Sequence, residues 1–226
     1  MQGPHNFYLF LKNCPGMQVI DCFLDEAIQL GVRGYNEKLL RLVKQEQPNL
    51  LFVFMYTDEV RKTTLSIIKS QWPNVKTLAW FSDDHWRLDN YSRFYAPYFD
   101  WVVTTYSRAP EKYRGYGIAN VIRSQWACNT FTWHPVLVPK RDIDVSFIGQ
   151  WNPSRGRIIA LLRAAGINVF VRGYRWPEGK ISQAEMIEIF SRSKINLNLN
   201  APAPLFHPKR LARIFLKNSV GRIVPD

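Results

Sequence analysis

The strongest constraint on the fold of this chain is a regular alternation between short apolar runs and segments with the spacing of an amphipathic helix. The run at 49–56, NLLFVFMY, is almost continuously apolar, which is typical of a strand buried on both faces of a sheet. The next segment, 58–71, returns to helical spacing. Strands are expected at 49–56, 75–82, 100–107, 119–126, 144–149, 168–173, 195–200 and 221–225. Helices are expected at 36–47, 58–71, 89–99, 109–117, 153–166, 182–194 and 208–219.

Two of the expected helices begin with a recognisable capping signal. Asn36 stands directly before the helical spacing of LLRLVK, and asparagine is a preferred N-cap residue because its side-chain oxygen accepts a free backbone N–H. Ser182 is followed three positions later by Glu185, which is the pattern of a capping box. We therefore expect helices to start at both positions.

The alternation is interrupted once. Residues 127–141 have no apolar period and contain Pro135 and Pro139, so this stretch is interpreted as a linker. Strands that alternate with helices of this length predict parallel sheets built from right-handed crossovers. The chain is therefore expected to be an α/β protein with two Rossmann-like lobes, one at 1–135 and one at 136–226.

The composition restricts the environment and the partners. A net charge of +12 suits nucleic acid, an anionic membrane surface or a phosphate-bearing ligand, with a basic solvated surface as the alternative. No zinc-finger spacing or arginine-rich run supports nucleic acid. The cysteines are three in number and lack CxxC spacing, which indicates reduced thiols. The apolar runs are too short to span a bilayer, and no signal peptide is evident, so a soluble cytoplasmic protein is expected.

A cluster of polar side chains follows the expected strand at 75–82. Asp83, Asp84 and His85 stand side by side there, and ligands of parallel sheets bind beyond the carboxyl ends of the strands. These residues could cap the next helix, hold a divalent metal, or take a proton from a substrate hydroxyl. No third acidic ligand lies nearby in the sequence. The residues by themselves favour capping.

Basic residues gather at two helix starts of the second lobe. In FIGQWNPSRGR, at 147–157, Gly149 permits close approach of a ligand and Arg155 stands beside free helix N–H groups. In HPKRLAR, at 207–213, cations oppose the helix dipole unless an anion binds. These cations are Lys209, Arg210 and Arg213. Both segments are compatible with phosphate binding, although neither is a GxGxxG motif or a P-loop; an ordinary turn and a solvated basic helix are the alternatives.

The second lobe resembles the C-terminal domain of GT-B glycosyltransferases, specifically the spore-maturation glycosyltransferase-like group. That group shows an Asp-Val-x-Phe-x-Gly strand, an arginine that opens the next helix, a Gly-x-x-Trp turn and a Ser-Lys-Ile-Asn-Leu-Asn stretch. These features fall on Asp144, Gly149, Arg155, Gly173, Trp176 and Ser193 to Asn198. The first lobe is similar to the group's N-terminal half in its Trp/Phe-rich strand into Asp-Asp and in YFDWVVTTYS. The resemblance covers roughly residues 50–221.

The resemblance implies an enzyme that moves a sugar from a nucleotide-diphosphate donor, such as a UDP-sugar, to an acceptor, usually without a metal or another cofactor. The acceptor would bind mainly on the first lobe, with Asp83, Asp84 or His85 as the proton acceptor. The donor would bind mainly on the second lobe. Its expected contacts are Gly149, Gln150, Arg155, Gly173, Trp176, Asn200, Lys209, Arg210 and Arg213. Nucleic acid is not expected as a partner, whereas the basic charge is compatible with peripheral contact to a membrane surface.

The chain departs from the group's pattern near its end. The group's Arg-x-Phe-Glu…Gly signature falls on Arg213, Phe215, Leu216 and Gly221. Leu216 therefore replaces an acid that often contacts the donor ribose, and a leucine cannot accept a hydrogen bond from a hydroxyl. Lys209 stands where glutamine is frequent, and a lobe ending at residue 226 is short for this group. A fragment, or a non-catalytic two-lobed protein that binds a nucleotide or a sugar, is the alternative interpretation.

Overall fold

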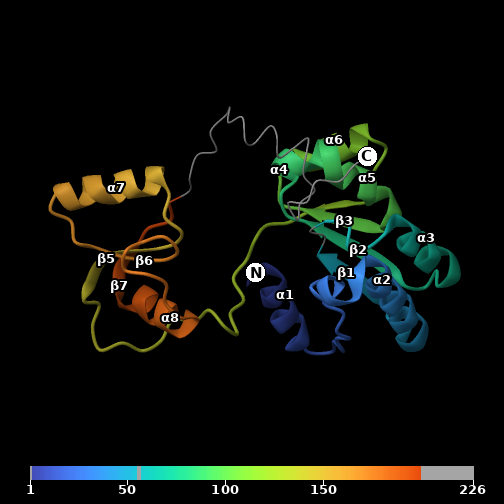
Figure 1. The fold of residues 1–226 in the computed structure, drawn as a ribbon, viewed down its shortest axis with the longest axis horizontal. Helices are drawn as coiled ribbons and strands as arrows, with labels where there is room; N and C mark the ends of the chain where they lie inside the picture. Colours follow the sequence, from blue (N-terminus) through green and yellow to red (C-terminus); the bar gives the residue numbers. More distant parts are fainter. Residues whose placement is uncertain (1, 55–56, 200–226) are drawn as a thin grey trace. The chain divides into compact units, whose positions relative to one another are not determined.

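The computed structural model describes residues 2–54 and 57–199 of this chain (Figure 1). The chain divides into two compact units, the first reaching Ala127 and the second starting at Cys128. The first contains a four-stranded sheet in the order β1-β2-β3-β4, and the second a three-stranded sheet in the order β6-β5-β7. Every pairing among these strands is parallel. The prediction of an α/β protein with parallel sheets is confirmed.

The first unit begins with two helices and then alternates between strands and helical segments. Its strands are β1 (Leu50–Phe54), β2 (Lys76–Phe81), β3 (Trp101–Thr104) and β4 (Val121–Arg123). Its longer helices are α1 (Gln2–Lys12), α2 (Glu26–Glu46), α3 (Lys62–Gln71) and α6 (Ala109–Gly115). Between β2 and β3 lie α4 (Asp84–Arg87), the π-helical η1 (Leu88–Ser92), α5 (Arg93–Tyr95) and the 3-10 turn η2 (Ala96–Tyr98).

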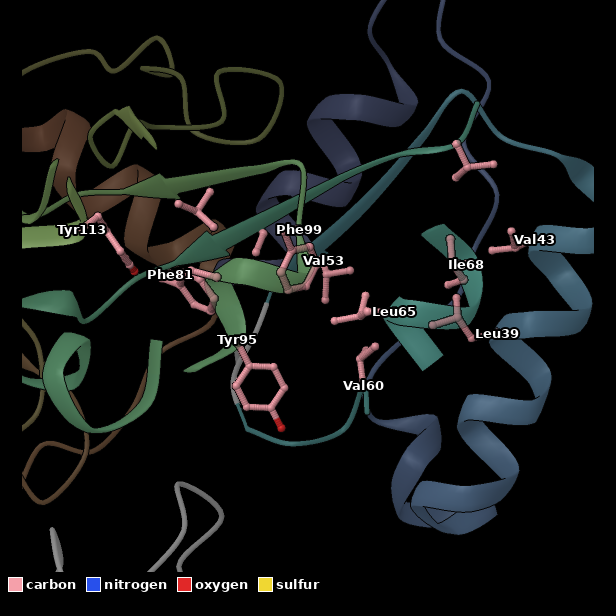
Figure 2. Packing of buried hydrophobic residues seen from close by; sticks show 14 of the residues in the cluster. Leu39, Val43, Val53, Val60, Leu65, Ile68, Phe81, Tyr95, Phe99 and Tyr113 are labelled. Carbon is pink, nitrogen blue, oxygen red and sulfur yellow. The ribbon is translucent and has the colours of Figure 1, made fainter. Parts of the chain in front are cut away.

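The main core of the first unit lies on one face of its sheet. Figure 2 shows Leu39 and Val43 of α2 packed beside Leu65 and Ile68 of α3, next to Val53 of β1. All these side chains are buried. Because β1 to β4 follow one another in a single direction, right-handed crossovers put their connecting helices on this same face. Each buried Leu or Ile side chain contributes about 1.5–3 kcal/mol of transfer free energy.

The opposite face of this sheet is covered less completely. Trp80 and Val103 are buried there, and Phe7 of α1 packs on them from a ring distance of 4.7 Å to Trp80. By the strand register Leu50, Trp101 and Ile122 point to the same face, yet their side chains are between 41% and 51% exposed. Within the described residues, apolar side chains on this face therefore remain partly exposed.

The second unit is built around a central strand. Its elements are β5 (Ile143–Ile148), α7 (Pro153–Ala164), β6 (Val169–Arg172), α8 (Gln183–Arg192) and β7 (Ser193–Asn196). Because β6 and β7 lie on opposite sides of β5, the two crossovers run in opposite directions, and α7 and α8 cover opposite faces of the sheet (Figure 1). Ile159 of α7 packs into the core formed by Val145, Phe147 and Val169.

Several local predictions are corrected by the structure. Asn36 is not an N-cap: α2 starts at Glu26, and Asn36 is buried inside it, where its amide donates to Val32 O and Glu59 O at 2.7 Å each. The segment expected as one helix at 89–99 is instead a succession of π, α and 3-10 turns. The strand expected at 119–126 is reduced to Val121–Arg123.

The capping box at the start of α8 is confirmed. Ser182 accepts a hydrogen bond from Glu185 N, and the Glu185 carboxylate accepts one from Ser182 N at 2.8 Å. The helix expected at 208–219 and the strand expected at 221–225 lie outside the described residues. Among the helices that are described, none has the length and apolarity needed to cross a membrane.

Candidate functional site

Asp84 lies in the interior of the first unit. Its side chain is 2% exposed, and its Oδ2 accepts a hydrogen bond of 3.0 Å from the hydroxyl of Tyr113, which is itself fully buried. Burial raises the pKa of Asp84 above its ordinary value, while the hydroxyls of Ser92, Thr104 and Tyr113 and the charge of Arg87 oppose that rise. This carboxyl group holds α4 against α6.

The other oxygen of Asp84 has no such support. Within the described residues, its buried Oδ1 has no hydrogen-bond partner. The unsatisfied oxygen adds to the cost of ionising the carboxyl group, because a buried charge without full hydrogen bonding is poorly stabilised. Arg87, 7% exposed, is a cation whose charge acts on Asp84, and its guanidinium lies 3.9 Å from the ring centroid of Tyr91. Because Asp84 points into the interior, its side chain can hold the α4 turn in place.

Asp83 and His85 lie on the outside of the same turn. Asp83 is half-buried and stands at the N-cap position of α4, but its side chain makes no capping hydrogen bond. The capping role that the residues by themselves favoured is therefore wrong for Asp83. His85 is exposed, and its ring centroid lies 6.5 Å from that of Tyr106, which follows β3. Both side chains are thus held at the carboxyl edge of the sheet.

No metal-ligand set accompanies this edge in the part of the chain that the structure describes. Groups of three or more His, Cys, Asp or Glu side chains able to hold an ion do not occur there. The adjacent π-helical turn, Leu88–Ser92, brings Ser92 back to Asp84. Short π-helical segments are frequent at functional sites, so this turn and the two outer side chains form the candidate site of the first unit.

The carboxyl edge of the second sheet is tightly packed. Gly149 follows β5, and its N–H donates to Arg172 O at 2.9 Å. A methyl group added to Gly173, whose φ is 140°, would lie only 2.1 Å from the carbonyl oxygen of Gly149. Gly173 is needed because its backbone touches that of Gly149, and Gly149 is needed because an added Cβ would lie 2.9 Å from the Phe147 ring. The sequence singles out both, and the structure brings them together.

Trp176 closes this contact from inside the lobe. Its indole N–H donates to Gly149 O at 2.9 Å, and its ring centroid lies 6.1 Å from that of Phe147. The side chain is 9% exposed, so its ring already packs in the core. Little of the ring is available for stacking, and Trp176 shapes the loop from within the core.

Arg155 joins the loops that follow β5 and β7. Its Nη1 donates to Gln150 O and its Nε to Leu199 O, both at 2.8 Å. These two loops flank the topological switch point, because β5 leads to one side of the sheet and β7 lies on the other. Asn152 caps α7 by accepting Arg155 N at 2.9 Å. The N-terminus of α7 and the Arg155 guanidinium therefore both lie at the switch point, and the free N–H groups of a helix N-terminus favour anions.

The remaining candidate donor contacts, Asn200, Lys209, Arg210 and Arg213, lie outside the described residues. An open groove of about 730 Å³ runs along α7 in the same lobe. It is lined by Trp151, Pro153, Arg157, Ala160, Arg163 and Pro177, among others. Sequence reasoning missed this groove and also the exposed side chains of Tyr174 and Arg175. Tyr174 and Arg175 could have been noticed in the sequence, because an aromatic and a basic residue stand together directly after an expected strand.

Neither a family model nor a curated protein matches this chain. Function is therefore inferred from the residues and their geometry. Two features bear on it: a pair of outward titratable groups, Asp83 and His85, at the edge of the first sheet, and the Arg155 arrangement at the edge of the second.

Proposed function

We propose that the protein is a glycosyltransferase of the GT-B type that moves a sugar from a nucleoside-diphosphate donor to an acceptor hydroxyl. The observation that carries this proposal is Arg155, which stands at the topological switch point of the second sheet beside the N-terminus of α7. Parallel sheets bind phosphorylated ligands at this location. The GT-B arrangement, in which the carboxyl edges of both sheets face one cleft, is part of the proposal.

In the proposed reaction the acceptor oxygen attacks the anomeric carbon of the donor sugar. A new bond forms between these two atoms, and the bond from the anomeric carbon to the diphosphate oxygen breaks. The acceptor proton moves to a general base, and the nucleoside diphosphate leaves with its electron pair. Arg155, together with Lys209, Arg210 and Arg213, would stabilise the charge that develops on the leaving diphosphate.

The base is assigned to Asp83, with His85 as the second candidate. Both side chains reach solvent at the carboxyl edge of the first sheet, whereas Asp84 is 2% exposed and hydrogen-bonded to Tyr113. Asp84 is therefore assigned a positioning role, because it anchors the turn that carries its two neighbours. In the proposed reaction the base and the cations that stabilise the diphosphate are protein side chains, so no step is assigned to a metal.

Leu216 favours a second candidate function. It replaces the acid that the resemblance places against the donor ribose, so a protein that binds a nucleotide or a sugar without transferring it is the alternative. The two candidates differ in turnover and agree in nucleotide binding.

A thermal-shift screen of the full chain with UDP, GDP, TDP and their sugars tests the shared step. A ligand that binds only the folded state raises the melting temperature. Arg213→Ala should weaken nucleotide binding by about 1.5–3 kcal/mol, the range for a hydrogen bond to a charged group. Arg141→Ala, an exposed arginine of the second unit, is the matched control and should bind normally. An unchanged melting temperature with every ligand would overturn both candidates.

Release of nucleoside diphosphate from the donor then separates transfer from binding, because water can replace an unknown acceptor. Asp83→Asn should abolish release and leave nucleotide affinity unchanged. EDTA should leave the rate unchanged. Full activity of Asp83→Asn and of His85→Gln would refute the assignment of the base, and binding without any release would favour the non-catalytic alternative.

A further inference from the structure

The loop between β6 and α8, residues 173–181, is a closed structure that carries an unusual backbone conformation. Gly173 N donates to Gly179 O at 2.8 Å, and Gly179 N donates to Trp176 O at 3.0 Å, so the two ends of the turn are joined. Inside it Arg175 adopts a φ of 66°. Residues other than glycine rarely adopt this left-handed conformation, and it clusters at ligand-binding sites where the surrounding structure holds it.

This β6–α8 loop presents an aromatic ring to solvent. Tyr174 is 50% exposed, although tyrosine side chains in folded proteins usually bury most of their ring. Its carbonyl oxygen accepts a hydrogen bond of 2.8 Å from Trp151 N, which ties it to the loop that follows β5. Tyr174 is therefore fixed at the carboxyl edge of the sheet, next to the loop that Arg155 also contacts through Gln150 O.

Two cations accompany the ring. The Arg175 guanidinium lies 5.3 Å and the Lys180 ammonium 5.0 Å from its centroid. The acid of the loop, Glu178, is directed to Arg163 at 3.5 Å. Within residues 2–54 and 57–199, no carboxylate lies within 4.0 Å of Arg175 or Lys180. The loop thus combines a half-exposed aromatic ring with positive charge that no carboxylate of the described residues neutralises.

We propose that Tyr174, Arg175 and Lys180 bind a nucleoside diphosphate, with the base stacked on the Tyr174 ring and the phosphates met by the two cations. Every nucleobase has a π face, and exposed aromatic rings flanked by basic residues bind nucleotides through stacking and charge together. Both cations stand on long flexible side chains and can turn from the ring toward a phosphate. The inference rests on the proposed function, because it names the part of the second lobe that recognises the donor's nucleoside.

Calorimetric titration of the full chain with UDP, with GDP and with inorganic pyrophosphate tests the assignment. Pyrophosphate carries the charge without the base. Tyr174→Ala should weaken binding of UDP or GDP by about tenfold to a hundredfold, the loss expected for one stacked base, and leave pyrophosphate affinity unchanged. Tyr174→Phe keeps the ring and should bind within about twofold of the wild type.

Arg175→Gly tests the charge without straining the fold, because glycine accepts a positive φ. It should weaken nucleotide and pyrophosphate binding equally, by about tenfold. Tyr116→Ala is the matched control: this tyrosine is 43% exposed and lies 4.8 Å below the Arg93 guanidinium in the first unit. Its replacement should leave all three affinities unchanged.

The outcomes separate the two proposals. A wild type that binds UDP or GDP, with Tyr174→Ala binding equally well, would overturn the loop assignment and leave the proposed function standing. A wild type that binds none of UDP, GDP and TDP would overturn both. Binding only of a single-stranded oligonucleotide, with the steep salt dependence of backbone contacts, would also overturn the assignment to a free nucleotide.

Discussion

Replacing Tyr113 by phenylalanine tests the buried contact that holds α4 against α6. The Tyr113 hydroxyl donates to Asp84 Oδ2 at 3.0 Å, and the two side chains are 0% and 2% exposed. The substitution removes one oxygen and leaves the ring packing in place. A hydrogen bond to a charged group contributes about 1.5–3 kcal/mol, and a buried acceptor left without its donor loses that amount. We expect the free energy of unfolding of the first unit to fall by this amount at neutral pH.

Tyr116, three residues after Tyr113, provides the control. The Tyr116 hydroxyl also donates to a carboxylate, Asp89 Oδ1, at 3.0 Å, but Tyr116 is 43% exposed. Water can replace that contact, so Tyr116→Phe should cost less than about 1 kcal/mol. Hydrogen exchange of peptides spanning 76–123 reads the first unit separately from the second. Equal losses in the two variants, or no loss in Tyr113→Phe, would refute the reasoning.

Two further predictions concern Asp84 and Gly173. Burial raises the pKa of Asp84 above 3.8, so the folded state keeps a proton that the unfolded state has lost, and the stability contributed by this group falls as pH rises from 3.8 through the folded pKa. Asp84→Asn should therefore gain stability relative to the wild type over that pH range in urea titrations, and a constant difference would contradict this. Gly173→Ala should destabilise the second unit by about 3 kcal/mol or more, since its methyl group would meet Gly149 O at 2.1 Å. Gly166 has a φ of 81°, and an added Cβ there would have no atom within 4 Å. Gly166→Ala should therefore lower the free energy of unfolding of the second unit by only about 1–2 kcal/mol, measured by hydrogen exchange of 143–172.

Much of the architecture could be read from local patterns. Continuous apolar runs such as LLFVF of β1 and the helical spacing of 58–71 predicted strands and helices in alternation, and this alternation leads to parallel sheets because consecutive parallel strands need a crossover. The capping box of Ser182 and Glu185 was also readable, since both partners lie within one turn. The apolar runs, the helical spacing and the capping box each lie within one short segment, so a local pattern is enough to find them.

The tertiary structure decided which of two adjacent aspartates points inward. Asp84 is buried because Tyr113, 29 positions away, donates to it, whereas Asp83 remains at the edge of the sheet. Asn36 shows the same limit: a good capping residue became an internal tether because Glu59, 23 positions away, accepts from its amide. Side-chain direction at these positions depends on which distant element packs against them. The local sequence pattern cannot predict that packing.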